Sequence, residues 1–360
     1  MAQPSTISIT DSTPSYTRSV HKERVVLLLL AASLIVGIFL SLTIGRYAIP
    51  AGQIIEIIYQ FFSADGVSAA NHQASVVLFI VRIPRILLAI MVGAGMAVAG
   101  TAYQGLFRNP MASPEILGAS DGAATGAVIS LLLGFSSGIM QLLSFIFGIA
   151  AVSLVLLVTK FVGQGRGSNS LLIMVLTGTV VSRIFTAIIS LAKYLADTQD
   201  KLPSITFWLM GSFARSGNTR SMIIMGLALL IGVLPLILLR YKMNVLSFGD
   251  EEARSMGVDT SKMRLVIIGC ATLLTSVAVS LCGIISWVGL IVPHICRFFV
   301  GPNHRALLPT SLLAGGLFML IVDNFARGLT LGELPISVLT SVIGAPLFLY
   351  MIFRERRRLL

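Results

Sequence analysis

The sequence predicts an all-α polytopic membrane protein with about ten transmembrane helices, some of them short and interrupted. Of its 360 residues, 56% are hydrophobic and only 11% are charged, and the mean hydropathy is +0.92. A water-soluble domain cannot bury so much apolar surface, whereas a bilayer is a solvent for it. Apolar runs near the length needed to span that bilayer follow one another along the chain.

The first run, residues 25–45, follows Lys22 and Arg24 and is too long to be the apolar part of a signal peptide. Residues 1–20 are polar and rich in Ser and Thr, which predicts a disordered cytoplasmic tail. We expect residues 21–360 to form a single transmembrane domain. The other predicted spans are residues 84–104, 114–133, 138–160, 170–192, 221–240, 264–282, 285–300, 306–326 and 334–353.

The basic residues orient these spans. An even number of spans puts both termini on one side of the membrane. With that side cytoplasmic, seventeen Lys and Arg residues fall inside and eight outside, while Arg183 falls within a span. Cytoplasmic loops carry the excess of basic residues, so the split favours cytoplasmic termini. The net charge of +11 is thereby explained, and we expect membrane lipid rather than nucleic acid as a partner.

Two stretches, residues 108–118 and 283–294, break the helical pattern inside apolar sequence, and both contain Gly and Pro. Irregular backbone at membrane depth is tolerated only where protein or water covers it, and it is common around a translocation path. Small residues also recur every four positions, as in Gly118, Gly122 and Gly126. This spacing predicts helices that pack closely or that line a path.

A dense polar island, residues 249–264, holds seven charged residues between two apolar spans. Asp250, Glu251 and Glu252 favour the positive end of a helix dipole, and Gly257 is a good helix stop. The island therefore predicts a short helix, and the orientation places its segment, residues 247–264, in the cytoplasm. A membrane protein that builds such a helix between two spans is expected to present it to a partner.

The chain lacks the common motifs of enzymes. It contains no Gly-x-x-x-x-Gly-Lys-Ser/Thr loop, no His-Glu-x-x-His motif and no Gly-x-Ser-x-Gly elbow. Cys270, Cys282 and Cys296 lie in apolar sequence without metal-ligand spacing. We expect no enzymatic activity, no metal and no cofactor held by this chain.

Charges at membrane depth are few, namely Asp121, Arg183 and Asp323. Ion-coupled transporters usually show a relay of such groups, so this sparse set disfavours that class. Arg183 has two interpretations. It faces a channel and meets an anionic substrate, or it snorkels or forms an ion pair at a helix interface.

Six ordered matches support a family resemblance. They are Arg82-Ile-Pro-Arg85 with Val92-Gly-Ala-Gly95, then Gly100–Gly118, Gly249–Val258, Gly283–Arg297, His304-Arg-Ala-Leu-Leu-Pro309, and Glu333-Leu-Pro-Ile336 with Ile343-Gly-Ala-Pro346. The chain resembles FecCD-type permeases, the membrane subunits of ABC importers for vitamin B12, iron-siderophores and haem. The resemblance implies ten helices per subunit in the bacterial inner membrane, with both termini cytoplasmic.

The resemblance also implies partners. Two permeases surround a channel, either two copies of this chain or this chain with a related permease. Two copies of a separate ATP-binding subunit use ATP and Mg, and a periplasmic or lipid-anchored substrate-binding protein delivers the cargo. The implied cargo is an iron chelate, with a siderophore as the first choice and haem, cobalamin or molybdate as alternatives. The alternative class is an ion-coupled secondary transporter.

Three groups of residues are carried over from the family. Arg82, Arg85 and Arg327 are expected to form exposed ion pairs with carboxylates of the binding protein. The coupling helix is expected to enter a groove of the ATP-binding subunit, with Ala253 and Met256 as apolar anchors; its residues are Glu251, Glu252, Ala253, Arg254, Met256 and Gly257. A gate at the inner end is expected at Ser168, Asn169 and Ser170, with Arg183 in the channel, and residues 203–210 are expected to form a helix at the outer mouth.

Overall fold

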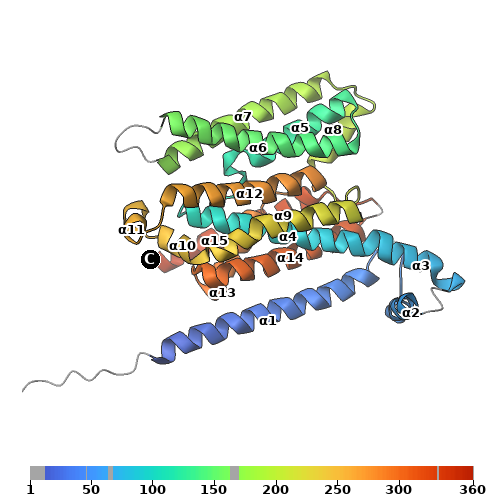
Figure 1. Cartoon of the computed structure of the whole chain (residues 1–360). Coiled ribbons are helices and arrows are strands. Elements are labelled where there is room, and N and C mark those ends of the chain that lie inside the picture. The colour runs from blue at the N-terminus through green and yellow to red at the C-terminus, as the bar shows by residue number, and fades with distance from the viewer. Residues whose placement is uncertain (1–12, 46, 64–67, 163–169, 331, 360) are drawn as a thin grey trace, which may run out of the picture.

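The computed structural model describes residues 13–45, 47–63, 68–162, 170–330 and 332–359, and within these ranges every regular element is a helix. Figure 1 shows their arrangement. The elements are α1 Thr13–Thr43, α2 Ala51–Phe62, η1 Ala69–Asn71, α3 His72–Val76, η2 Val77–Arg82, α4 Ile83–Leu106, η3 Pro114–Leu117, α5 Ala119–Leu133, α6 Ser137–Val162, α7 Ser170–Leu195, α8 Lys201–Leu209, α9 Thr219–Leu238, α10 Arg240–Leu246, α11 Asp250–Ser255, α12 Thr260–Cys282, α13 Val288–Val300, α14 His304–Gly328 and α15 Ile336–Leu359.

All ten predicted spans coincide with apolar helices. Within the described residues, seven helical stretches are long and apolar enough to cross a membrane, and α5, α13 and residues 336–351 of α15 are shorter apolar helices. Some spans were predicted to be short, and α5 and α13, which correspond to the predicted spans 114–133 and 285–300, confirm this. The helix expected at residues 203–210 is also confirmed, as α8.

The sequence predicts a disordered tail through residue 20, but the last part of that segment is helical in the structure. Helix α1 begins at Thr13, so residues 13–20 extend the first span as a helix, and residues 1–12 lie outside the described residues. Pro14 is the second residue of α1, where its fixed backbone angle suits the first turn of a helix. A polar, Ser- and Thr-rich composition is therefore a poor guide to the point at which this helix begins.

The first predicted break is confirmed, and the second is narrower than predicted. Between α4 and α5 the chain is irregular except for the single turn η3. The second break covers only residues 283–287, because α13 continues through Pro293. The proline removes one backbone donor from α13. Gln104 of α4 donates to the carbonyl of Leu290 at 3.0 Å, next to the carbonyl of Gly289 that would have accepted from residue 293, so a side chain of a neighbouring helix supports α13 near its proline.

Helix α4 is the centre of the bundle. It packs against α9, α12, α13 and α14, while α5 packs against α6 and α7 in the second group of helices in Figure 1. Glycines allow backbones to touch at these crossings. A Cβ atom on Gly93 would lie 2.2 Å from the carbonyl oxygen of Gly315 in α14, and one on Gly100 would lie 1.8 Å from that of Gly289 in α13.

The glycines of α5 have the same function. A Cβ on Gly122 would lie 2.6 Å from the carbonyl oxygen of Phe147, and one on Gly126 would lie 2.4 Å from that of Leu143. Both acceptors belong to α6. Close packing, one of the two interpretations of the small-residue spacing, is therefore confirmed at these positions.

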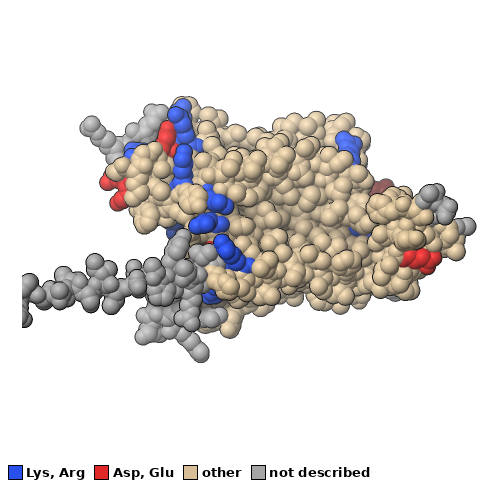
Figure 2. Space-filling model, turned by 60° about the horizontal axis from the view of Figure 1, so that its bottom comes forward, with Lys and Arg blue, Asp and Glu red and all other residues tan. Residues whose placement is uncertain are grey.

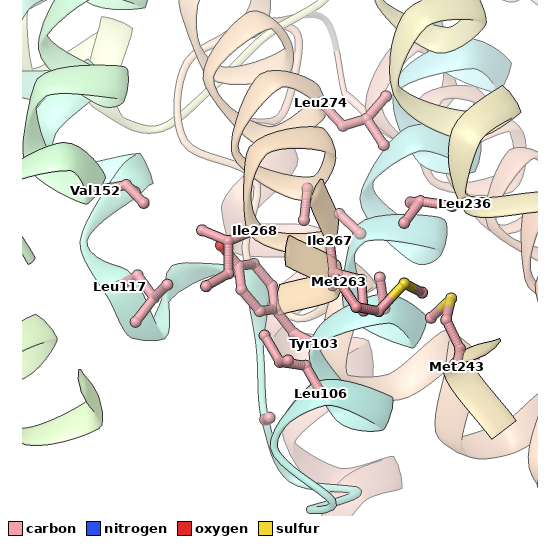
Figure 3. Packing of buried hydrophobic residues seen from close by; sticks show 14 of the residues in the cluster. Tyr103, Leu106, Leu117, Val152, Leu236, Met243, Met263, Ile267, Ile268 and Leu274 are labelled. Carbon is pink, nitrogen blue, oxygen red and sulfur yellow. The ribbon is translucent and has the colours of Figure 1, made fainter. Parts of the chain in front are cut away.

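Figure 3 shows the core that joins the spans to the α10–α11 end of the molecule. Tyr103 and Leu106 of α4 pack with Met243 of α10 and with Met263 and Ile267 of α12, and all five are at most 4% exposed. The charged island is thus connected to the central helix by a continuous buried cluster.

This packing predicts a strong difference between two alanine substitutions in spanning helices. Gly100→Ala places a methyl group on the backbone of Gly289, and overpacking against backbone costs about 1–3 kcal/mol or more. Gly269→Ala in α12 is the matched control, because nothing lies within 4 Å of the added atom. Thermal unfolding in detergent, followed by size-exclusion chromatography, should show a lower midpoint for Gly100→Ala alone. Equal midpoints for the two variants would contradict the packing described here.

Candidate functional site

A buried ion cluster lies at the end of the bundle opposite α11. Asp323 of α14 is fully buried and accepts from Arg85 at 2.8 and 3.0 Å. Its second oxygen lies 3.0 Å from Nε of Arg327, one turn further along α14. Arg85 also donates two hydrogen bonds, of 2.7 and 3.0 Å, to Glu333. The cluster therefore ties α4 and α14 to the segment that leads into α15.

Two of the arginines also close the end of α1. Arg82 donates to the backbone carbonyls of Leu42 and Tyr47, and Arg327 donates to the carbonyl of Ile44 at 3.2 Å and to the hydroxyl of Ser41 at 2.6 Å. The last carbonyls of a helix have no intrahelical partner and carry partial negative charge. Arg82 supplies such a donor to Leu42 in the last turn of α1, and the other contacts hold the segment that follows the helix, at Ile44 and Tyr47.

The expectation that Arg82, Arg85 and Arg327 are exposed is wrong. Their exposed fractions are 4%, 6% and 8%. The contacts that cover them come from α1 and α14, which are distant in sequence from the Arg-Ile-Pro-Arg motif. Arg327 lies within the last turn of α14 and not after it.

A pocket nevertheless opens onto this cluster. It has a volume of about 200 Å³, and all three arginines and Glu333 line it. Among the described residues, the cluster has three guanidinium groups and two carboxylates, and Arg82 has no carboxylate within salt-bridge distance. The residues of the cluster around the pocket therefore carry a net charge of +1. This charge favours the binding of an anionic group in the pocket.

The charged island folds as predicted. Helix α11 has Asp250, Glu251 and Glu252 in its first turn, where the helix dipole favours negative charge. Gly257 ends it with a left-handed backbone, φ 76°. Val258 donates to the carbonyl of Ala253 at 2.9 Å, which with the Gly257 bond completes a Schellman motif.

Internal contacts hold α11 against the bundle. Arg264 in the first turns of α12 forms an ion pair with Asp250, and Arg254 donates to the hydroxyl of Thr260 at 3.3 Å. Asp259 caps α12 by accepting from the backbone N–H of Lys262 at 3.0 Å, and this hydrogen bond lowers the pKa of the Asp259 carboxyl. Some of the charged side chains of the island therefore hold α11 in its position against the bundle.

The predicted apolar anchors need one correction. Ala253 is fully buried in the core of its own chain, because the Schellman turn folds its face onto α10 and α12. It cannot contact a partner. Met256 is 59% exposed, and Phe248, which the sequence analysis did not select, is 67% exposed. The free surface of this segment therefore combines Phe248 and Met256 with the exposed Glu251 and Glu252.

A signal for Phe248 was present in the sequence. It is a large apolar residue between the end of a span and a run of acids. Exposed apolar side chains of this kind, rimmed by charge, are typical of docking surfaces.

The residues assigned to the gate and channel are only partly described. Ser168 and Asn169 lie outside the described residues, and Ser170 begins α7 without a described side chain. Arg183 is exposed on α7. It lies within electrostatic reach of Asp121 in the first turn of α5, which accepts a hydrogen bond from Ser182. Arg183 therefore lies near the first break, the irregular segment between α4 and α5. It is distant from the start of α7, where the predicted gate residues lie.

The surface charge is polarised along the molecule. On the face in Figure 2, Lys and Arg gather at the end that carries α11 in Figure 1, and a broad uncharged belt separates that end from the α2 end. The belt is what a bilayer-spanning surface requires.

The helical fold and the uncharged belt together define a polytopic helical membrane protein. The sequence model of the FecCD transport family matches residues 33–354. The chain belongs to this family, and it is the permease subunit of an ABC importer of the FecCD type. Permease subunits of this kind are not themselves catalytic, and they work with ATP-binding subunits and substrate-binding proteins.

Similar proteins agree on this class. The molybdate import system permease protein MolB of Haemophilus influenzae is 40% identical over 324 residues, covering 90% of this chain and 94% of that protein. The Fe(3+) dicitrate transport system permease protein FecD of Escherichia coli is 37% identical over 292 residues, covering 80% and 88%. A solved metal-chelate-type ABC transporter in an inward-facing conformation has a TM-score of 0.79 at 37% identity, covering 92% of this chain and 99% of that one.

Proposed function

We propose that this permease carries an anionic metal compound into the cell, along a path that includes the exposed polar face of α7. The observation that carries the proposal is the exposed Arg183 in the middle of a spanning helix. A guanidinium group facing hydrocarbon is costly, so the side chain must face water, a partner or a ligand.

The rest of α7 supports a path on this side. Thr179, Thr186 and Ser190 are exposed and lie on the same face as Arg183, at helical spacings of three and four residues. Their hydroxyls donate to the carbonyls one turn earlier, at 2.9 to 3.0 Å. Each hydroxyl oxygen can still accept a hydrogen bond, so the face suits water or a polar cargo.

Two cargoes of this class have specific support. A ferric chelate, with a siderophore as the first expectation from the sequence, is supported by the similarity to the Fe(3+) dicitrate permease FecD and to the metal-chelate-type transporter. Molybdate is the second candidate, because MolB is 40% identical over 94% of its length. Molybdate is an anion and a ferric chelate with excess carboxylate or catecholate groups is also anionic, so Arg183 suits either of them.

The α11 surface is the proposed site of coupling to the ATP-binding subunit. Phe248 and Met256 supply an apolar centre, and Glu251 and Glu252 steer the approach. Ala253 and Gly257 shape the helix from within, and Arg254 holds it to the start of α12. Two ATP-binding subunits, each with its own ATP and Mg, would serve two permeases, and closure of the ATP-bound pair would move α11.

The opposite end is the proposed site for the substrate-binding protein. The pocket beside Arg82, Arg85 and Arg327 has an excess of positive charge and can receive a carboxylate of that protein. In this proposal the pocket lies at the outer face of the bacterial inner membrane, and both termini lie in the cytoplasm. The gathering of Lys and Arg at the α11 end supports this orientation.

Substitution of Arg183 tests the path. Uptake of radiolabelled ferric siderophore and of radiolabelled molybdate should be compared in cells that lack their own permeases. Arg183→Gln should lower uptake of the true cargo about ten-fold, because it removes one charge-assisted contact, and Arg183→Lys should retain most of it. Equal uptake by wild type and Arg183→Gln, at equal membrane levels, would remove Arg183 from the path.

Substitutions on α11 test the coupling site. Met256→Glu and Phe248→Glu should weaken retention of the ATP-binding subunit about ten-fold during purification, because each places a charge at a desolvated contact. Met256→Leu should retain it. Lys262→Glu is a further control, since Lys262 is 86% exposed beside the same helix. Full retention by both glutamate variants would place the ATP-binding subunit elsewhere.

A further inference from the structure

Two further pockets adjoin each other at the ends of α6, α9 and α12 that lie opposite α11, away from the ion cluster. The larger one, of about 250 Å³, is a mostly apolar groove lined by Leu142 and Phe145 of α6, Ile224 of α9 and Val277 of α12. The smaller one, of about 80 Å³, is more polar. Gln141 and Leu281 line both, so the two form one continuous site with an apolar part and a polar part.

Each part is bordered by an arginine. Arg215 lines the polar pocket beside Ser137 and Ser212, and Arg220 lines the groove. Arg220 is exposed and has no hydrogen bond or ion pair to another described residue. No carboxylate lines either pocket. The site therefore carries positive charge that the described part of the chain does not balance.

The position of Arg220 adds to this imbalance. It is the second residue of α9, and Asn218 caps the same helix end. A helix N-terminus already carries partial positive charge, so a cation there is unfavourable unless an anion lies nearby. The arrangement is suited to a phosphate group, which guanidinium and helix N-termini both bind.

The groove opens onto the surface that faces the bilayer. On α6, Leu142 in the groove and Ile146 beside it are 57% and 47% exposed, and on α9 the neighbouring Ile223 and Leu227 are both 54% exposed. An apolar groove on such a surface is in contact with acyl chains. A soluble ligand would have to displace them, whereas a lipid already lies there.

We propose that an anionic phospholipid binds here, with its phosphate contacted by Arg215 and Arg220 and one acyl chain in the groove between α6, α9 and α12. The lipid comes from the leaflet at the end opposite α11. Both α6 and α9 pack on α12, so the acyl chain fills the space between two helices that share one neighbour. The site would stabilise the contact between the α5–α8 group and the rest of the bundle.

Native mass spectrometry of the permease purified with its ATP-binding subunit tests this inference, with phosphatidylglycerol and phosphatidylethanolamine added in turn as probes. We expect phosphatidylglycerol to be retained preferentially. Arg220→Gln should reduce its retention about five-fold, the effect of about one basic residue on an anionic lipid. Ile224→Trp should abolish it by filling the groove.

Leu227→Trp is the matched control, because Leu227 is exposed on the same helix but does not line the groove. It should leave retention unchanged. Equal retention in Ile224→Trp and wild type, or an equal loss in Leu227→Trp, would overturn the site. Retention of both lipids alike, unaffected by Arg220→Gln, would overturn the role of the arginines.

Discussion

Helix α4 touches the backbones of its neighbours, and the rest of the structure depends on that close approach. Hydrophobic attraction does not drive helices together in lipid, so tight van der Waals contact must do so. Glycines of α4 allow it against α14 and α13. The same helix supplies Arg85 to the ion cluster at one end and Tyr103 and Leu106 to the α11-linked core at the other. The two ends are thereby connected by one packed element.

The second constraint is that charge and irregular backbone at membrane depth must be satisfied within the chain. Asp323 meets two arginines, the end of α1 is closed by Arg82 and Arg327, and Gln104 supports α13 near its proline. The exceptions to this rule are informative. Arg183 faces outward from a spanning helix, and Arg220 lies at the positive end of another. These exceptions are the positions where we propose a cargo and a lipid.

The spans, including the short α5 and α13, and the helices α8 and α11 could be predicted from the sequence, because hydropathy and end signals are local properties. The helices α2, α3 and α10 were not predicted. The exposure of the site residues could not be predicted either. Arg85 and its partner Asp323 are 238 residues apart, and neither residue's local sequence indicates the other. Ala253 fits an exposed anchor equally well until the turn at Gly257 folds its face onto the core. Phe248 is the exception, because its signal is local: it is a large apolar residue directly before the acidic run.

The most direct test of the account is transport by the purified permease with its ATP-binding subunit and binding protein in proteoliposomes. Accumulation of labelled ferric siderophore and of labelled molybdate should be measured with ATP, and separately with an imposed proton or sodium gradient. We predict accumulation of one of these cargoes that requires ATP and the ATP-binding subunit and persists when ionophores remove the gradients. Accumulation driven by a gradient without ATP would contradict the account.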